Sequence, residues 1–221
     1  MKAEYVDHMG SDLTVVNAAR VSFDKHADEF SDKDKGLISF LSKHGHFTPF
    51  THAMVTVRET VPIFVARQRF KHTVGFSYNE VSRRYVSDDP EFFQPKEWRL
   101  AAENVKQGSS DQVLSKEALD GENSRHWGTL RQEIDGHLNE SMILYHRLMD
   151  EGVCAEQARM VLPQSMYTSY YVTGSLSAWA RAYILRAEET AQKEIQDLAH
   201  MWSDIIEPLF PVCWDALTKE K

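Results

Sequence analysis

The chain has 221 residues, enough to bury one sizeable core, and its 42% hydrophobic and 26% charged residues are typical of a globular protein. Its 25 Lys and Arg against 33 Asp and Glu give a formal charge of −8, which argues against general binding of nucleic acid. The sequence has no apolar run of signal-peptide or membrane-span length, so we expect a cytoplasmic protein without membrane contacts.

The first sixty residues are predicted to hold two helices and a strand. Ser11 or Asp12 can cap a helix that runs through Ala19, and Asp34 to Lys43 has the apolar spacing of a second helix. From Ala53 to Val61 the pattern changes to period two, with valines on one side and polar residues on the other. This alternation predicts a half-buried strand.

A helix is expected after this strand. Pro62 suits the first helical position, where its missing N–H has no cost, and the helix is predicted to continue to His72. Gln68, Lys71 and His72 would then share one face near its C-terminal end, because they have i, i+3, i+4 spacing. Gly75 is expected to end it.

The second half of the chain is predicted to be mainly helical. Asn104 to Ser124 has little periodicity and is typical of a surface insertion. A long amphipathic helix is expected from Trp127 to Gly152, and a shorter one from Ala155 to Val161. Met166 to Leu176 is a strand or a bent turn, and a helical pattern with a clear core stripe runs from Ser177 to Pro208.

A basic cluster stands out in an otherwise acidic chain. It comprises Arg67, Arg69, Lys71, Arg83 and Arg84, opposed only by Glu80. Ser82 and Arg84 alternate on one side of an expected strand, which suits recognition of a phosphate, although a solvated edge strand would show the same pattern. A carboxylate among cations can also accept from sugar or ring donors, so the cluster favours a nucleotide as ligand.

Arg186 is a second candidate. On a helix it would lie on the inward stripe with Trp179 and Tyr183, where a guanidinium needs a partner because its desolvation is costly. That partner could be Glu59 or another carboxylate, or a ligand group that becomes anionic during a reaction. Arg159 raises the same question less strongly.

Histidines and cysteines offer two further possibilities. His44, His46 and His52 could bind a divalent metal, which would favour a metal-dependent nucleotide hydrolase, or could simply mark the junction of a helix and a strand. The two cysteines, Cys154 and Cys213, are too few for a disulfide framework and are expected to be buried structural thiols. A non-enzymatic alternative is single-strand binding through the basic and aromatic run from Arg67 to Tyr85.

Six fragments in chain order carry a resemblance to one enzyme family: AARVSF, HGHFTPFTH, PIFVARQRFKH, SYNEVSRRY, ARMVLP and LRAEETAQKEIQ. On these motifs the chain resembles the flavin-dependent thymidylate synthases, which methylate dUMP to dTMP with a folate methylene group and a reduced flavin. The resemblance implies an α/β (α+β) fold, a single domain over 1–221 with a central mixed or antiparallel sheet flanked by helices. Residues 104–124 would be a surface insertion in that domain.

The family signature is Arg-His-Arg followed by Ser-x-Asn-Glu-x-Ser-x-Arg-Tyr. The run from Ser77 to Tyr85 matches its second part. At its first part the better phase places Lys71-His72-Thr73, with a spacer one residue longer, whereas Arg67-Gln68-Arg69 is the alternative triplet. Because lysine cannot form the bidentate hydrogen bonds of arginine, we expect the flavin to be bound differently here.

The resemblance assigns residues to each ligand. Contacts with dUMP would fall on Gln68, Lys71, Glu80, Val81, Ser82, Arg83, Arg84 and Arg186, and on Arg159 from a neighbouring subunit. Contacts with FAD would fall on Ser22, Thr48, Lys71, His72, Thr73, Glu80, Ser175, Ser177 and Arg181. His46 matches a histidine near the active site and Arg186 matches the activating arginine, so both are assigned to catalysis.

The resemblance also implies a mechanism and its partners. Arg186 would stabilise negative charge at the uracil O2/N3 edge and make C5 more nucleophilic toward the methylene group of 5,10-methylenetetrahydrofolate, with no cysteine nucleophile. FAD would carry the hydride and NADPH would reduce the flavin again. The family further implies a homotetramer with active sites at subunit interfaces, no metal, and neither nucleic acid nor membrane as a partner.

Overall fold

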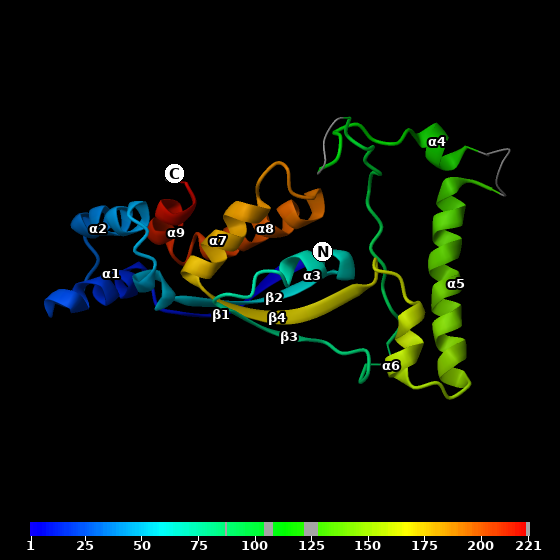
Figure 1. Ribbon diagram of the computed structural model, residues 1–221, viewed down its shortest axis with the longest axis horizontal. Coiled ribbons are helices and arrows are strands. Elements are labelled where there is room, and N and C mark those ends of the chain that lie inside the picture. The colour runs from blue at the N-terminus through cyan, green and yellow to red at the C-terminus, as the bar shows by residue number, and fades with distance from the viewer. Residues whose placement is uncertain (87, 104–107, 122–127, 220–221) are drawn as a thin grey trace. The chain divides into compact units, whose positions relative to one another are not determined.

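The computed structural model describes residues 1–86, 88–103, 108–121 and 128–219 (Figure 1). These residues form two compact parts. We call residues 1–60, 67–80 and 169–221 the sheet part, and residues 61–66 and 81–168 the helix part. None of the helices in the described ranges combines the length and the hydropathy of a membrane span.

The sheet part is built on four strands. They are β1 (Lys2–Met9), β2 (Met54–Pro62), β3 (Phe76–Glu80) and β4 (Tyr167–Ser175), in the spatial order β1-β2-β4-β3. The pairs β1–β2 and β3–β4 are antiparallel, and hydroxyl pairs at Thr56–Thr173 and Thr60–Ser169 have the register of an antiparallel β2–β4 pair. The prediction of an antiparallel sheet flanked by helices is confirmed.

The outer strand β1 was not predicted from the sequence. Its pairing with β2 is irregular between Tyr5 and Asp7, and most of its residues are exposed. A strand with this bulge has no clean alternation of apolar and polar residues, which is the signal that identifies strands in sequences. The predicted strand at β2 is confirmed, since Val55, Val57 and Val61 are fully buried.

Helices from both ends of the chain belong to the sheet part. The N-terminal ones are α1 (Asp12–Arg20), η1 (Val21–Phe23), α2 (Asp32–Lys43) and η2 (Thr48–Thr51), and the C-terminal ones are α7 (Leu176–Arg186), α8 (Lys193–Ile206) and α9 (Pro211–Thr218). Figure 1 shows α7 and α8 on the same side of the strands. Trp179, Trp202 and Trp214 from these helices have no exposed surface and form the centre of the core.

The C-terminal helices differ in two ways from the prediction. The single helical stretch expected from Ser177 to Pro208 is two helices, and α9 beyond Pro208 was not expected. The carboxylate of Asp12 accepts hydrogen bonds from the backbone N–H groups of Val212 and Cys213, both at 3.0 Å. Asp12 therefore caps α9, while Ser11 is the N-cap of its own helix α1.

The helix after β2 is shorter than predicted. Pro62 is the last residue of β2, and α3 runs only from Ile63 to Arg69. Lys71 and His72 follow it in a turn, in which their N–H groups bond to the carbonyls of Gln68 and Arg69. The expected shared helical face of Gln68, Lys71 and His72 is therefore wrong, because two of the three lie beyond the helix.

The helix part is dominated by α5 (Leu130–Asp150). It is contacted by α4 (Lys116–Asp120), α6 (Ala155–Ala158) and η3 (Arg159–Val161), as Figure 1 shows for the two α-helices. The long helix and the short one before Pro163 confirm the prediction for this region, although Trp127 lies outside the described residues. Of the expected insertion, 104–107 and 122–124 also lie outside them, and the remainder holds α4 and a bridge between Arg99 and Val113.

Candidate functional site

A buried ion pair lies beneath the candidate site. Arg69, at the end of α3, donates from Nε to Oε1 of Glu59 at 3.1 Å, and both side chains are fully buried. The hydroxyl of Tyr170 on β4 donates to the other carboxylate oxygen of Glu59 at 2.5 Å. Glu59 occupies the inward row of β2 between Val57 and Val61, so its charge must be compensated inside the core.

Aromatic rings surround the Arg69 guanidinium. Its carbon lies 4.3 Å from the ring centroid of Phe76, 4.8 Å from that of Trp179 and 4.7 Å from that of Trp202. The Nη2 group is buried without a hydrogen-bond partner, and these ring faces supply part of the missing stabilisation through cation–π attraction. Because no part of Arg69 is exposed, it cannot contact a ligand, which favours Lys71-His72-Thr73 over Arg67-Gln68-Arg69 as the ligand-binding triplet.

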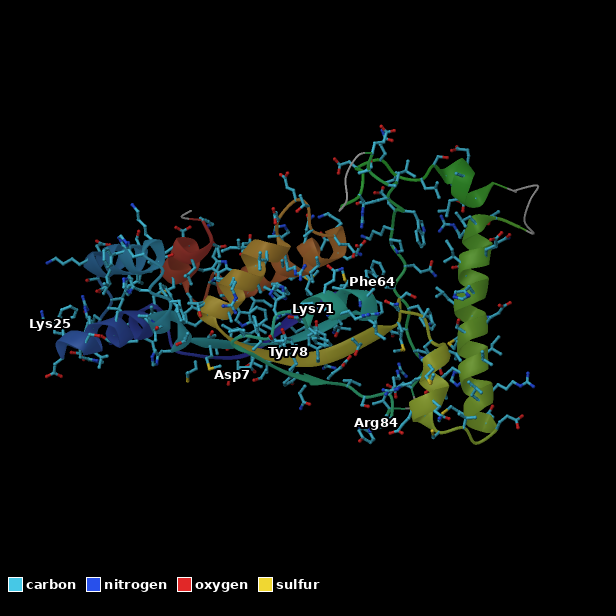
Figure 2. All side chains as sticks on the ribbon, viewed as in Figure 1. Asp7, Lys25, Phe64, Lys71, Tyr78 and Arg84 are labelled. Carbon is cyan, nitrogen blue, oxygen red and sulfur yellow. The ribbon has the colours of Figure 1, made fainter. Side chains whose placement is uncertain are left out.

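Tyr78 on β3 links this core to the loop that follows α3. Its hydroxyl accepts from Nη1 of Arg69 at 2.5 Å and donates to the backbone carbonyl of His72 at 2.7 Å. Burial raises the pKa of Tyr78 to about 12, so the phenol keeps the proton that it donates. Lys71, which begins the loop, and Tyr78 are labelled in Figure 2.

Arg186 ends α7 and turns toward the same loop. It donates from Nε to Nε2 of His72 at 2.8 Å, and from Nη2 to the carbonyl of Gln68 at 3.2 Å. Glu59, one of the partners considered for Arg186, is bound to Arg69 instead, so that expectation is wrong. Among the described residues Nη1 of Arg186 makes no hydrogen bond, which leaves one amino group for a ligand.

His72 is neutral in this setting. Burial, followed by the nearby guanidinium groups of Arg186, Arg69 and Arg181, lowers the pKa of His72 to about 4. A neutral imidazole can accept the Arg186 hydrogen bond at Nε2, and its proton must then reside on Nδ1. The site thus combines an uncharged acceptor with a partly buried cation.

Gln68 is held by a second line of side chains. Its amide nitrogen donates to Oε1 of Gln192 at 2.6 Å, and the amide nitrogen of Gln192 donates to Glu194 at 2.8 Å. Gln68 is therefore held at its side chain by Gln192 and at its backbone carbonyl by Arg186.

The loop from Lys71 to Gly75 presents cationic and hydroxyl groups. The Lys71 side chain is exposed and has no hydrogen bond or ion pair with any residue in the described ranges, and Thr73 is also exposed. Arg181 donates to the carbonyl of Val74 at 2.5 Å. Gly75 has a positive φ of 80°, and a Cβ there would lie 2.9 Å from that of Ala178, so the close approach to α7 requires glycine.

The start of α7 contributes two serines beside this loop. The N–H of Ser175 donates to the carbonyl of Gly75 at 3.1 Å, and the hydroxyls of Ser175 and Ser177 lie 3.2 Å apart. A lysine, an arginine and several hydroxyls form a donor set that suits the phosphates of a dinucleotide cofactor such as FAD. Unlike these residues, Ser22 in η1 and Thr48 in η2 form no hydrogen bond with residues 71–75, all of which lie in the described range.

The histidine cluster has a simpler environment. The ring of Phe40 lies 4.4 Å from that of His44 and 6.1 Å from that of His46. Over residues 1–86, 88–103, 108–121 and 128–219, no group of three His, Cys, Asp or Glu residues is arranged to hold a metal ion. His44 and His46 are exposed beside Phe40, and neither of these two described side chains forms a hydrogen bond with Arg186.

The remaining signature residues lie in the helix part. Strand β3 ends at Glu80, and Ser82 to Tyr85 form a turn, so the prediction of a strand face shared by Ser82 and Arg84 is wrong. Ser82 still contacts Arg84, since its hydroxyl accepts from the backbone N–H at 3.3 Å and from Nε at 3.4 Å. Arg83 donates to the carbonyl of Asp88, and Val81 is exposed.

Glu156 on α6 gathers two of the candidate arginines. Arg84 donates from Nη1 to its carboxylate at 3.1 Å, and Arg159 donates from Nε to its backbone carbonyl at 3.4 Å. Both arginines are exposed, so this cluster is available to an anion. Nothing in the sequence pattern indicated Glu156.

The cysteines have different environments. Cys213 is buried as expected, whereas Cys154 is exposed at the N-cap of α6, so the prediction that it is buried is wrong. Burial and the nearby Asp12 carboxylate raise the pKa of the Cys213 thiol. A thiol held protonated in this way is a poor nucleophile.

Comparisons with known proteins agree with these features. The family model described as "Thymidylate synthase complementing protein" matches residues 4–212. The flavin-dependent thymidylate synthase of Thermosipho africanus is 38% identical over 217 residues, which cover 97% of this chain and 89% of that protein. The protein of the same name from Thermotoga neapolitana is 36% identical, with coverage of 98% and 90%.

A solved structure is also similar. The UMP/dUMP methylase PolB from Streptomyces cacaoi, bound with 5-Br dUMP, matches with a TM-score of 0.79 and 29% identity. The match covers 97% of this chain and 93% of that one.

Proposed function

Because the chain belongs to the family of flavin-dependent thymidylate synthases, we propose that it methylates dUMP to dTMP. The carbon donor is 5,10-methylenetetrahydrofolate, FAD carries the hydride, and NADPH is the reductant. The observation that carries this proposal is the placement of Arg186, a partly buried guanidinium bound to a neutral histidine with one amino group left over.

Arg186 acts on the uracil ring in this proposal. A guanidinium at the O2/N3 edge stabilises the negative charge that develops there as C5 attacks the methylene carbon. Since His72 is uncharged, it holds Nε of Arg186 without neutralising the cation. Burial and the neighbouring Arg69 lower the pKa of Arg186, as expected for a cation that awaits an anionic partner.

The phosphate and ribose of dUMP are bound by the signature residues. For this role we propose the residues that match the family motif, which are Gln68, Lys71, Glu80, Val81, Ser82, Arg83, Arg84 and Arg159. The exposed Arg84 and Arg159 around Glu156 support this role, because guanidinium forks match phosphate oxygens. In a homotetramer, which we propose as the active form, Arg159 serves the site of a neighbouring subunit.

The flavin is bound by the loop from Lys71 to Thr73 together with Arg181, Ser175 and Ser177. Glu80, Ser22 and Thr48 complete this set, with His46 near the reacting groups. When bound, reduced FAD supplies a hydride to the methylene carbon. The protein residues bind its phosphates and orient it, and a cysteine nucleophile is not needed, in keeping with the raised pKa of Cys213.

The proposal is tested by spectroscopy and product analysis on the purified chain. We expect an oxidised-flavin spectrum, with or without added FAD, that bleaches when NADPH is added anaerobically with dUMP. We further expect dTMP to form only when methylenetetrahydrofolate is present. A chain that binds no flavin and forms no dTMP under these conditions would contradict the proposal.

The role of Arg186 is tested by a matched pair of arginine variants. Arg186→Ala should retain flavin and folded structure but lose dTMP formation by about 100- to 1,000-fold, the usual effect of removing one charge-stabilising donor. Arg58→Ala, which removes an exposed arginine from β2, should leave the rate unchanged. Near-normal turnover of Arg186→Ala would remove this residue from the mechanism.

A further inference from the structure

One continuous chain of hydrogen bonds connects the core of the sheet part to the candidate site. It starts at the buried Glu59, passes through Arg69 to the hydroxyl of Tyr78, and from there to the backbone of His72. The imidazole of His72 then holds Arg186 at 2.8 Å. Among the described residues, the Tyr78 hydroxyl is the side-chain group that joins the buried ion pair to this loop.

The hydrogen bond between Arg69 and Tyr78 joins the two ends of the loop. Arg69 is the last residue of α3 and Tyr78 lies on β3, so their bond at 2.5 Å closes the base of the segment between them. That segment contains Lys71, His72 and Thr73, of which Lys71 and Thr73 are exposed. Without the bond from Tyr78 to the carbonyl of His72, this residue would be held by its own N–H bond to the carbonyl of Arg69 and by the contact of its imidazole with Arg186, and its carbonyl would lose this partner.

The anchor itself is rigid. Arg69 is fixed by Glu59 and by the ring faces around it. The ring of Tyr78 packs against Phe70, Phe76 and Tyr170 with centroid distances of 5.0, 6.0 and 6.1 Å. The Tyr78 hydroxyl bonds to Arg69 in the core and to the carbonyl of His72 in the loop, so it holds the loop in a fixed position relative to the core.

We propose that Tyr78 is a positioning residue for the reaction: its hydroxyl, held by the buried Arg69, fixes the carbonyl of His72 and thereby aims the imidazole that orients Arg186. This inference rests on the proposed function only for its effect on turnover. The geometric claim, that Tyr78 sets the orientation and environment of His72, stands apart from the reaction and can be tested without it.

The first test compares two tyrosine variants of the full chain. Tyr78→Phe removes the hydroxyl and keeps the ring contacts, whereas Tyr170→Phe removes a hydroxyl from the far side of the same ion pair, without a bond to His72. We expect Tyr78→Phe to lower kcat for dTMP by about 10- to 100-fold, because misplacing a group that contacts the substrate is costly, while KM for dUMP changes little. Tyr170→Phe should lower stability but leave kcat within about twofold.

The second test measures His72 directly. In protein with isotope-labelled histidine, the His72 signal is identified by its absence in His72→Gln. We expect His72 of the natural chain to be neutral, with Nε2 unprotonated and a pKa of about 4, because burial and then the nearby Arg186, Arg69 and Arg181 disfavour the charged imidazole. In Tyr78→Phe the freed imidazole should move away from these cations, and its pKa should rise toward the ordinary value of about 6.5.

The outcomes separate the two proposals. A natural chain that makes no dTMP, yet shows the His72 shift in Tyr78→Phe, contradicts the proposed function and supports the positioning role. A natural chain that is active, with kcat and the His72 titration unchanged in Tyr78→Phe, overturns the positioning role. So does an equal loss of kcat in Tyr170→Phe. If Tyr78→Phe does not fold, the natural chain still decides, because a protonated Nε2 on His72 above about pH 6 would overturn the orientation that the inference requires.

Discussion

The buried cluster around Arg69 and the exposed loop at Lys71 begin two residues apart in the chain, yet their cations have opposite surroundings. Arg69 has a carboxylate, a phenol and several ring faces as partners and no exposed surface. Lys71 is exposed, with no polar partner among the described residues. The difference indicates that one cation of the basic cluster belongs to the core and the other to a ligand.

The comparison also shows how the two regions depend on each other. A loop that must present a lysine and hydroxyl groups to an anion cannot bury enough surface to fix itself. Here the loop is held by the buried Arg69, through the hydroxyl of Tyr78 and the carbonyl of His72. The buried ion pair therefore matters less for its own energy than for where it holds the loop.

Removing the buried cation, Arg69, should have the largest effect on stability. Arg69→Ala leaves Glu59 charged in the core with Tyr170 as its one remaining partner among the described residues, which should lower the free energy of unfolding by about 3–5 kcal/mol. Denaturant unfolding of the natural chain and the variant measures this difference. Arg67→Ala, which removes an exposed arginine from the same helix, is the control and should change stability by less than about 0.5 kcal/mol.

A double variant sharpens the same point. Glu59→Leu with Arg69→Met removes both charges and keeps similar volume, so it should recover most of the stability that Arg69→Ala loses. Comparable losses in Arg69→Ala and Arg67→Ala would show that Arg69 is not the compensating charge for Glu59.

Part of this arrangement could be predicted from the sequence. The row Val55, Val57, Val61 identified the inward face of β2, and Glu59 falls in that row, so a buried carboxylate in need of a cation was visible in the pattern. What periodicity could not supply was the partner. Arg186 was considered for it, and the choice of Arg69 depends on where α3 ends, which is set by tertiary contacts rather than by propensity.

The elements that were missed have physical reasons as well. β1 carries a bulge and is mostly exposed, so its side chains do not alternate, and α9 follows a proline that is typical of the end of a helix. The start of α9 is stabilised by Asp12, which is 200 residues away from Val212 in the chain and cannot be paired with it by local patterns. Of the candidate site, the identities of the residues were accessible from motifs, whereas the roles of Tyr78 and Glu156 required the structure.

His72 lies between the two regions and should give a smaller, pH-dependent effect. Its pKa is about 4 in the folded chain and about 6.5 in the unfolded chain, so the unfolded chain takes up the proton first as the pH falls. The stability that comes from neutral His72 is therefore complete above about pH 6.5 and is lost as the pH falls toward 4. Because the side chain is only half-buried, solvent limits the size of this loss.

Urea unfolding between about pH 7.5 and 4.5 measures this dependence. The natural chain should lose more stability over this interval than His72→Gln, which cannot take up the proton. Identical slopes for the two proteins would mean that His72 is not held neutral by its surroundings.

Removing the exposed cation, Lys71, should have the smallest effect on stability. It should instead weaken the binding of the flavin. Lys71→Ala should leave the free energy of unfolding within about 0.5 kcal/mol, since the side chain forms no hydrogen bond or ion pair with the part of the chain that the structure describes. It should weaken FAD binding by about tenfold, the value of one charge-assisted contact with a phosphate, as measured by flavin fluorescence titration. Lys71→Arg should retain or tighten FAD, because its fork can contact two phosphate oxygens at once. Unchanged affinity in both variants would place the phosphates elsewhere, with Arg181 at Val74 as the next cation to test.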